Sequence, residues 1–238
     1  MVWKCPGYCP ECKGHNGLPI CASIRKNETV LFKLHGQGVK PESAKRARVR
    51  YLENIQKAFR ELTADYDWMP DIKSVRNSSN RKTGDIPCIN MPALMTCSGE
   101  HANTENGCGN GTCYAVHGLQ ATYPAVRARV RNYLLYKRDP DRFWGLVDDA
   151  TRNSRFARYH DSGDIVDYDY LCGMVEQARK RPGTIYWTMT KKFDIVNRYI
   201  DQNGDLPGNL VIMPSGWSCY NVDDYNPHSL PVTGVYSE

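Results

Sequence analysis

The chain contains 238 residues, which suits one domain or one domain with an appendage. Its charged fraction of 24% and hydrophobic fraction of 41% are ordinary for a soluble protein, so a packed core is possible. The net charge of +5 fits an anionic partner such as nucleic acid without requiring one. No apolar run reaches membrane-spanning length and the chain does not start like a signal peptide, so we expect a cytoplasmic protein without membrane contact.

The first 40 residues are rich in cysteine, and we interpret them as a metal-binding knuckle. Thiols stay reduced in the cytoplasm, so the ten cysteines of the chain are easier to explain as metal ligands than as disulfides. Cys5, Cys9 and Cys12 have the spacing of the radical-SAM cluster motif, and Cys21 supplies a fourth thiol. A closed four-thiolate site is structural, so we expect zinc or an auxiliary iron–sulfur cluster here rather than a catalytic cluster.

An amphipathic helix is predicted from about Ser43 to Leu62, after a possible strand over residues 29–32. Apolar residues recur at helical spacing within it, at Ala44, Ala47, Tyr51, Leu52, Ile55, Phe59 and Leu62. The other face of this helix is basic and carries Lys45, Arg46, Arg48, Arg50 and Lys57. Such a face is usually only solvated, and contact with phosphate is the alternative.

A second group of cysteines lies in a loop rich in glycine and asparagine. This three-cysteine loop contains Cys97, Cys108 and Cys113. Three thiolates without a fourth leave an open coordination position, as a catalytic metal site requires, whereas His101 or His117 would close the site. Such a loop makes a poor core, so we favour a metal site over the alternative of buried free cysteines.

Beyond this loop, the sequence alternates between helical and strand patterns. Helices are predicted from about Tyr123 to Leu135 and from Asp141 to Ala150. There follow a strand (155–160), a helix (167–180), a strand (184–189), a helix (192–202) and a strand (209–213). A further short strand is possible at 93–96, before the three-cysteine loop. Such alternation predicts parallel strands with right-handed crossovers. We therefore expect an α/β fold, a partial or small (β/α) barrel over residues 41–238, preceded by the knuckle over residues 1–40.

Five consecutive residues after the strand at 155–160 are polar or small. They are His160, Asp161, Ser162, Gly163 and Asp164. Clustered ionisable groups are typical of functional sites, and α/β proteins place their chemistry at the carboxyl ends of strands. We expect His160, Asp161 and Asp164 to face the same cavity as the three-cysteine loop, with one carboxyl pKa raised. The alternative is a tight turn in which Gly163 supplies backbone freedom and Ser162 or Asp164 caps the next helix.

Two later strands also end in polar side chains. Lys191 follows the strand at 184–189 and is either a ligand for phosphate or carboxylate, or a solvated lysine. Ser215 and Cys219 follow the last of the alternating strands, and either reach the same site or belong to a simple turn.

Several of these segments together resemble the bacteriophage family called gene product 88. The segments are Asn90-Met-Pro-Ala-Leu-Met-Thr-Cys97, Cys113-Tyr-Ala115, Tyr123-Pro-Ala-Val-Arg127, His160-Asp-Ser-Gly-Asp164 and Tyr186-Trp-Thr-Met-Thr-Lys191. The resemblance covers about residues 86 to 200. It implies a viral protein that works in the cytoplasm of the host cell, and it says little about chemistry.

Two further resemblances suggest the chemistry. A three-cysteine loop followed by a helix and a strand ending in Ser-Gly-acid is similar to radical-SAM enzymes. That similarity implies that the loop holds an iron–sulfur cluster and that Ser162, Gly163 and Asp164 contact S-adenosylmethionine. Alternatively, residues 161–163 resemble the Asp-Ser-Gly-Gly motif of guanine transglycosylases. In that case Asp161 and Asp164 would share the attack on the sugar and the reading of the guanine edge, and zinc would be structural.

We therefore expect a phage metallo-enzyme of the radical-SAM-like kind that modifies a nucleobase or nucleic acid. Its candidate catalytic residues are His160, Asp161, Asp164 and Lys191. The second interpretation is a DNA guanine or deazaguanine transglycosylase with structural zinc. The third is a zinc-dependent nucleic-acid-binding protein without catalysis.

Overall fold

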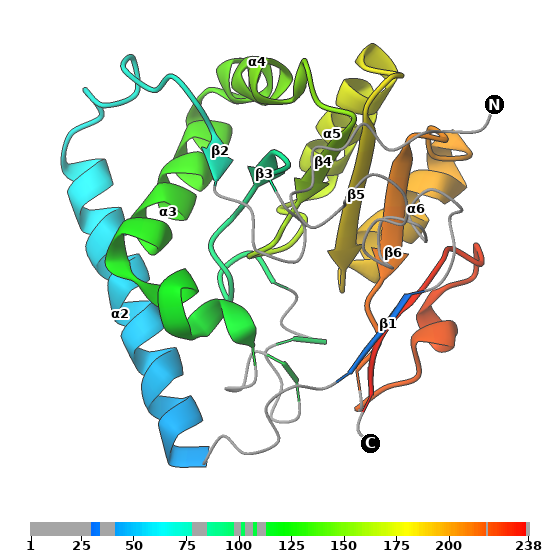
Figure 1. Cartoon of the computed structure of the whole chain (residues 1–238), viewed down its shortest axis with the longest axis horizontal. Coiled ribbons are helices and arrows are strands. Elements are labelled where there is room, and N and C mark those ends of the chain that lie inside the picture. Colours follow the sequence, from blue (N-terminus) through cyan, green and yellow to red (C-terminus); the bar gives the residue numbers. More distant parts are fainter. Residues whose placement is uncertain are drawn as a thin grey trace.

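The computed structural model describes residues 30–33, 41–77, 85–97, 101–102, 107–108, 113–217 and 219–236. These residues form a mixed α/β fold with a five-stranded sheet and helices (Figure 1). The predicted knuckle, with Cys5, Cys9, Cys12 and Cys21, lies outside the described residues. None of the described helices is long and apolar enough to cross a membrane.

The elements are named here in chain order within each class. The α-helices are α2 (Pro41–Ala64), α3 (Tyr123–Arg138), α4 (Pro140–Thr151), α5 (Tyr168–Lys180) and α6 (Phe193–Asn203). The short 3-10 helices are η1 (Tyr114–Val116), η2 (Gly118–Ala121) and η3 (Val222–Tyr225). The strands are β1 (Val30–Lys33), β2 (Arg76–Asn77), β3 (Cys88–Ile89), β4 (Phe156–Tyr159), β5 (Ile185–Thr190), β6 (Leu210–Pro214) and β7 (Thr233–Tyr236).

The predicted alternation after residue 155 is confirmed, with each boundary within one residue of its prediction. The possible strand at 93–96 is wrong, because residues 93–95 form a turn and the strand lies earlier, at β3. Leu94 has a φ of 63°, which ends any extended backbone, and the Thr96 amide closes the turn on the Pro92 carbonyl at 3.2 Å.

The main sheet has the strand order β2-β3-β4-β5-β6. Strands β3, β4, β5 and β6 are parallel to one another, and the edge strand β2 is antiparallel to β3. Among the described strands β2 and β6 are unjoined edges, so the sheet is open and the predicted barrel is not confirmed. Four parallel strands are about half the number that closes a barrel of this class. A separate parallel pair, β1 and β7, touches the main sheet through a bridge between Ser215 and Thr233.

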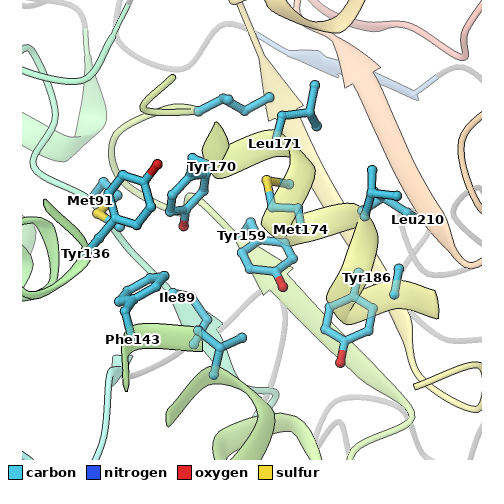
Figure 2. Close-up of a cluster of buried hydrophobic side chains, with 14 of the residues drawn as sticks. Ile89, Met91, Tyr136, Phe143, Tyr159, Tyr170, Leu171, Met174, Tyr186 and Leu210 are labelled. Atoms are coloured by element: carbon cyan, nitrogen blue, oxygen red, sulfur yellow. The ribbon is translucent and has the colours of Figure 1, made fainter. Parts of the chain in front are cut away.

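An aromatic core fills the space between the sheet and α5. Figure 2 shows Tyr170 and Met174 of α5 near Tyr159 and Tyr186 of the strands. The rings of Tyr159 and Tyr186 stack with centroids 5.6 Å apart. This core holds the sheet flat against its helices and so fixes the positions of the strand ends.

A second core lies between α2 and α3, which run side by side in Figure 1. Tyr51, Ile55 and Leu62 of α2 are buried there, together with Val126 and Val130 of α3. The helical spacing predicted for the apolar face of α2 is therefore confirmed. Cys97 and Cys113 pack against this second core, which places two residues of the three-cysteine loop between it and the sheet.

Candidate functional site

Four loops leave the parallel strands at one edge of the sheet, because the carboxyl ends of parallel strands lie together. We call this region the carboxyl edge; it comprises residues 90–97, 160–164, 191–192 and 215–217. The loop at 160–164 lies in the middle, since β4 pairs with β3 on one side and with β5 on the other. The five predicted residues therefore occupy the position from which all neighbouring loops can be reached.

Asp164 joins the loops after β3 and β5. Its carboxylate accepts hydrogen bonds from the Thr190 hydroxyl (2.5 Å), the Lys191 amide (2.9 Å) and the Ile165 amide (2.8 Å). Its own amide donates to the Thr96 hydroxyl at 3.0 Å. Burial raises the pKa of Asp164, and these hydrogen bonds oppose the rise. A raised pKa of one carboxyl group was expected from repulsion between two neighbouring carboxylates, but its cause at Asp164 is burial, and Asp161 is paired with Arg158 instead.

Ser162 and Gly163 fasten the loop after β4 to the loop after β3. The Ser162 amide donates to the Asn90 side-chain oxygen at 3.1 Å, and the Met91 amide donates to the Ser162 carbonyl at 3.0 Å. Gly163 has a φ of 82°, and a Cβ atom there would lie 2.6 Å from the Met91 carbonyl oxygen and 2.7 Å from the Thr96 hydroxyl. Glycine is thus required both by the backbone conformation and by the close approach of the neighbouring loop.

The helix that follows this loop is capped by a different residue from the two we considered. Asp167 is the N-cap of α5, and its carboxylate accepts a hydrogen bond from the Tyr170 amide at 2.9 Å. The capping role considered for Ser162 or Asp164 is therefore wrong. Their contacts are made with other loops of the carboxyl edge instead.

Asp161 connects β4 to the two 3-10 helices that follow Cys113. Its side chain is 1% exposed and forms an ion pair with Arg158 at 2.6 Å. It also accepts hydrogen bonds from the side-chain amide of Gln120 and from the Tyr114 hydroxyl, both at 3.2 Å. This network is buried and charge-assisted, and it holds the end of the three-cysteine loop against the sheet.

His160 points to another part of the molecule. Its φ is 61°, and its Nδ1 lies 3.0 Å from the Thr188 hydroxyl. Its ring lies 5.5 Å from that of Tyr170 in α5, on the helix-covered side of the sheet. Burial lowers the pKa of His160 to about 3, so the imidazole is neutral at physiological pH. Asp161 lies with Arg158 and Tyr114 instead, so the structure does not bring His160 and Asp161 together.

The three cysteines of the loop share one electrostatic environment with Asp164. Burial raises the pKa of Cys97 well above its ordinary value, and the neighbouring Asp164, Cys113 and Cys108 raise it further. Burial followed by the charge of Cys108 raises the pKa of Cys113 to about 11. Among the described residues, none of these three cysteines forms a disulfide. Within the described ranges, no three histidine, cysteine or acidic side chains are placed to hold a metal ion.

Lys191 brings a positive charge to the same region. Its ammonium group donates to the Ser215 hydroxyl at 3.0 Å and lies 5.5 Å from the centre of the Trp217 ring. Its charge opposes the rise in the pKa of Cys113. Lys191 is therefore held by the loop after β6, near enough to Cys113 to affect its pKa, while a phosphate or carboxylate ligand for it stays a prediction.

The two histidines considered as additional ligands lie in different surroundings. The ring of His101 contacts Phe193, Tyr220 and Tyr225, with centroids 4.6 to 5.2 Å apart. His117 separates η1 from η2. The fourth ligand of a metal at the three-cysteine loop therefore stays open.

Several residues that form or contact the carboxyl edge were not identified from the sequence. Arg158 carried a usable signal, since a charged residue inside a buried strand needs a partner. Tyr114, Gln120, Thr96 and Thr190 carried none, because their roles depend on loops that meet only in the folded chain.

Comparison with known proteins gives one match. A family model described as Gene product 88 matches residues 42–224 of the chain. No curated protein and no solved structure matches the chain.

Proposed function

The chain belongs to the Gene product 88 family of phage proteins, and we propose that it is a metallo-enzyme whose centre is held by the three-cysteine loop. The observation that supports this proposal is that Cys108, Cys113 and Asp164 all lie close enough to Cys97 to raise its pKa. The three thiols are not arranged as a metal-binding group in this structure, so binding would require them to draw together. These side chains gather at the carboxyl edge, where α/β proteins place their chemistry.

The chemistry of these donors fits a soft metal ion or an iron–sulfur cluster. Thiolates are the ligands that zinc and iron–sulfur clusters prefer. Without a cation, burial first and neighbouring charges second raise the pKa of Cys97 and of Cys113, so both are protonated thiols at neutral pH. A bound cation reverses this effect and deprotonates the ligands. Metal binding at these cysteines would therefore release protons.

The leading form of the proposal is an iron–sulfur cluster that works with S-adenosylmethionine on a nucleobase or nucleic acid. Three thiolates leave one iron open, and the cluster would supply the electron that starts radical chemistry. The parallel strands β3, β4, β5 and β6 lie in sequence order, as in a partial barrel, and support this assignment. The cysteines follow the first of these strands and Asp164 follows the second.

The residues of the chain itself would bind and orient the cofactor. Asp164 is held by the Thr190 hydroxyl and the Lys191 amide, so its position is fixed before any ligand arrives. We assign it to the amino group of S-adenosylmethionine, with Ser162 and Gly163 supplying backbone contacts. The basic face of α2 would contact phosphates of a nucleic-acid substrate in the host cytoplasm.

The contacts of Asp161 count against its use as the attacking group of a transglycosylase, while Asp164, which the first form uses for the cofactor, is also held by three hydrogen bonds. An attacking carboxylate must present an oxygen to the sugar. Asp161 is committed to Arg158, Gln120 and Tyr114, so it anchors a loop instead. A transglycosylase with structural zinc, or a zinc-dependent nucleic-acid-binding protein, becomes the better description if the centre contains only zinc.

The test is reductive cleavage of S-adenosylmethionine by protein that is purified and reconstituted without oxygen. We expect the reduced wild-type protein to release 5′-deoxyadenosine. Cys113→Ser should abolish release, whereas Cys172→Ser on α5 should leave it unchanged, because Cys172 lies in a different element. Absence of cleavage by a fully iron-loaded protein would contradict the radical-SAM-like form.

A further inference from the structure

A separate cavity lies between α6 and η3. Its volume is about 390 Å³, which is within the range of small-molecule sites. The residues that matter for its chemistry are His101, Phe193, Tyr225, Asp194, Asp223 and Asp224. Among the described residues that line it there is neither Lys191 nor a cysteine, which separates this aromatic pocket from the residues of the proposed metal centre.

Three aromatic side chains form one wall of the aromatic pocket. The ring of His101 lies 4.8 Å from that of Phe193 and 4.6 Å from that of Tyr225, measured between centroids. Phe193 and Tyr225 stack at 5.3 Å with 24° between their planes. Asn197 fixes this wall by donating to the Tyr225 carbonyl at 2.9 Å. The π faces of such rings carry negative electrostatic potential.

His101 is the most informative member of this wall. Its residue is only 9% exposed, and its ring contacts the rings of Phe193, Tyr220 and Tyr225. A polar ligand group that reaches this imidazole would replace hydration lost on burial. The aromatic pocket is the place from which a ligand can do so.

The rim of the aromatic pocket is acidic. Asp194 lies in the first turn of α6, and Asp223 and Asp224 lie in the first turn of η3. The dipole of α6 favours a carboxylate at the position of Asp194. A single short turn such as η3 has little dipole, so the same effect does not explain the positions of Asp223 and Asp224. Among the described residues, no lysine or arginine forms an ion pair with any of these three carboxylates.

We propose that the aromatic pocket binds a small organic cation of the alkylammonium class. Aromatic faces and carboxylates both attract such a cation, and the combination recurs in sites for quaternary ammonium groups. A hard metal ion would gain nothing from the rings, and a phosphate backbone would be repelled by the rim. This inference does not depend on the proposed metal centre.

The probes are choline and its neutral isostere 3,3-dimethyl-1-butanol, titrated into the full-length protein and followed by NMR. Choline should bind saturably and about tenfold more tightly than the isostere, because only choline carries the charge that the rings and carboxylates attract. The affinity for choline should also fall as salt is added.

Matched variants decide whether the binding occurs at this place. Asp223→Asn with Asp224→Asn should weaken choline binding about threefold or more, and Tyr225→Leu should do the same. Asp205→Asn, at the other end of α6, should change nothing. Far-ultraviolet circular dichroism checks that Tyr225→Leu folds, and if it does not, the double aspartate variant decides alone. Equal binding of choline and the isostere, or equal weakening by Asp205→Asn, would overturn the proposal.

Discussion

At the scale of single residues, the two carboxylates of the carboxyl edge have different roles. Asp161 is paired with a buried guanidinium and holds a loop, whereas the carboxylate of Asp164 accepts hydrogen bonds from a hydroxyl and two backbone amides and, among the described residues, forms no ion pair. The sequence placed both in one cluster but contained nothing to separate them. Their roles differ because their neighbours come from β3, β5 and the 3-10 helices, which lie far away in the chain.

Asp161→Asn tests the anchoring role. Removing the negative charge leaves Arg158 buried without a counter-charge, so we expect the free energy of unfolding to fall by about 3 kcal/mol. Asp149→Asn is the control, because Asp149 pairs with Arg152 on the surface, where a pair contributes roughly 0–1 kcal/mol. Urea unfolding of the three proteins measures the difference. A stable Asp161→Asn variant that has lost activity would instead support an attacking carboxylate.

Asp164→Asn tests the raised pKa. The folded protein holds the Asp164 proton more tightly than the unfolded chain does, since burial raises its pKa above the ordinary value of 3.8. Its contribution to stability is therefore greatest below pH 3.8 and is lost as the pH rises through the folded pKa. Urea unfolding across this range should show a decline in the wild type relative to Asp164→Asn. Parallel pH profiles for the two proteins would refute the raised pKa.

At the scale of elements, the alternation of α5, β5, α6 and β6 could be predicted because it rests on local periodicity. The apolar face of α2 could be predicted for the same reason. The strands β2 and β3 could not, since each has two residues and exists only through its pairing. The packing of the loops at the carboxyl edge could not be predicted either, apart from the need for a glycine at Gly163.

Gly163→Ala tests the close approach of those loops. Gly204 is the control, because it also has a positive φ, of 79°, but has open space around it. We expect Gly204→Ala to cost about 1 kcal/mol for the backbone conformation alone. Gly163→Ala should cost about 3 kcal/mol, since the added Cβ also meets the Met91 carbonyl. Thermal unfolding compares them, and equal costs would show that the loops can separate freely.

At the scale of the whole molecule, the sequence predicted the α/β class and the family, while the closure of the sheet depends on pairings that no local pattern encodes. The boundary between the knuckle and the main domain stays a prediction. Cys9→Ser should expose the amides of roughly the first 25 residues to hydrogen exchange, because metal rather than a core would hold so small a unit. The exchange of α5 and β5 should not change. Unfolding of both parts together would show that they form one unit.

The metal content of protein purified without oxygen shows whether the three-cysteine loop holds an iron–sulfur centre. The proposed centre predicts iron and acid-labile sulfide, with a loss of iron in Cys113→Ser and none in Cys172→Ser. Cys9→Ser distinguishes iron bound at the knuckle from iron bound at the three-cysteine loop, because this variant should lose only the iron of the knuckle. A colourless protein that contains zinc, or whose iron is unaffected by Cys113→Ser, would contradict an iron–sulfur centre at the three-cysteine loop.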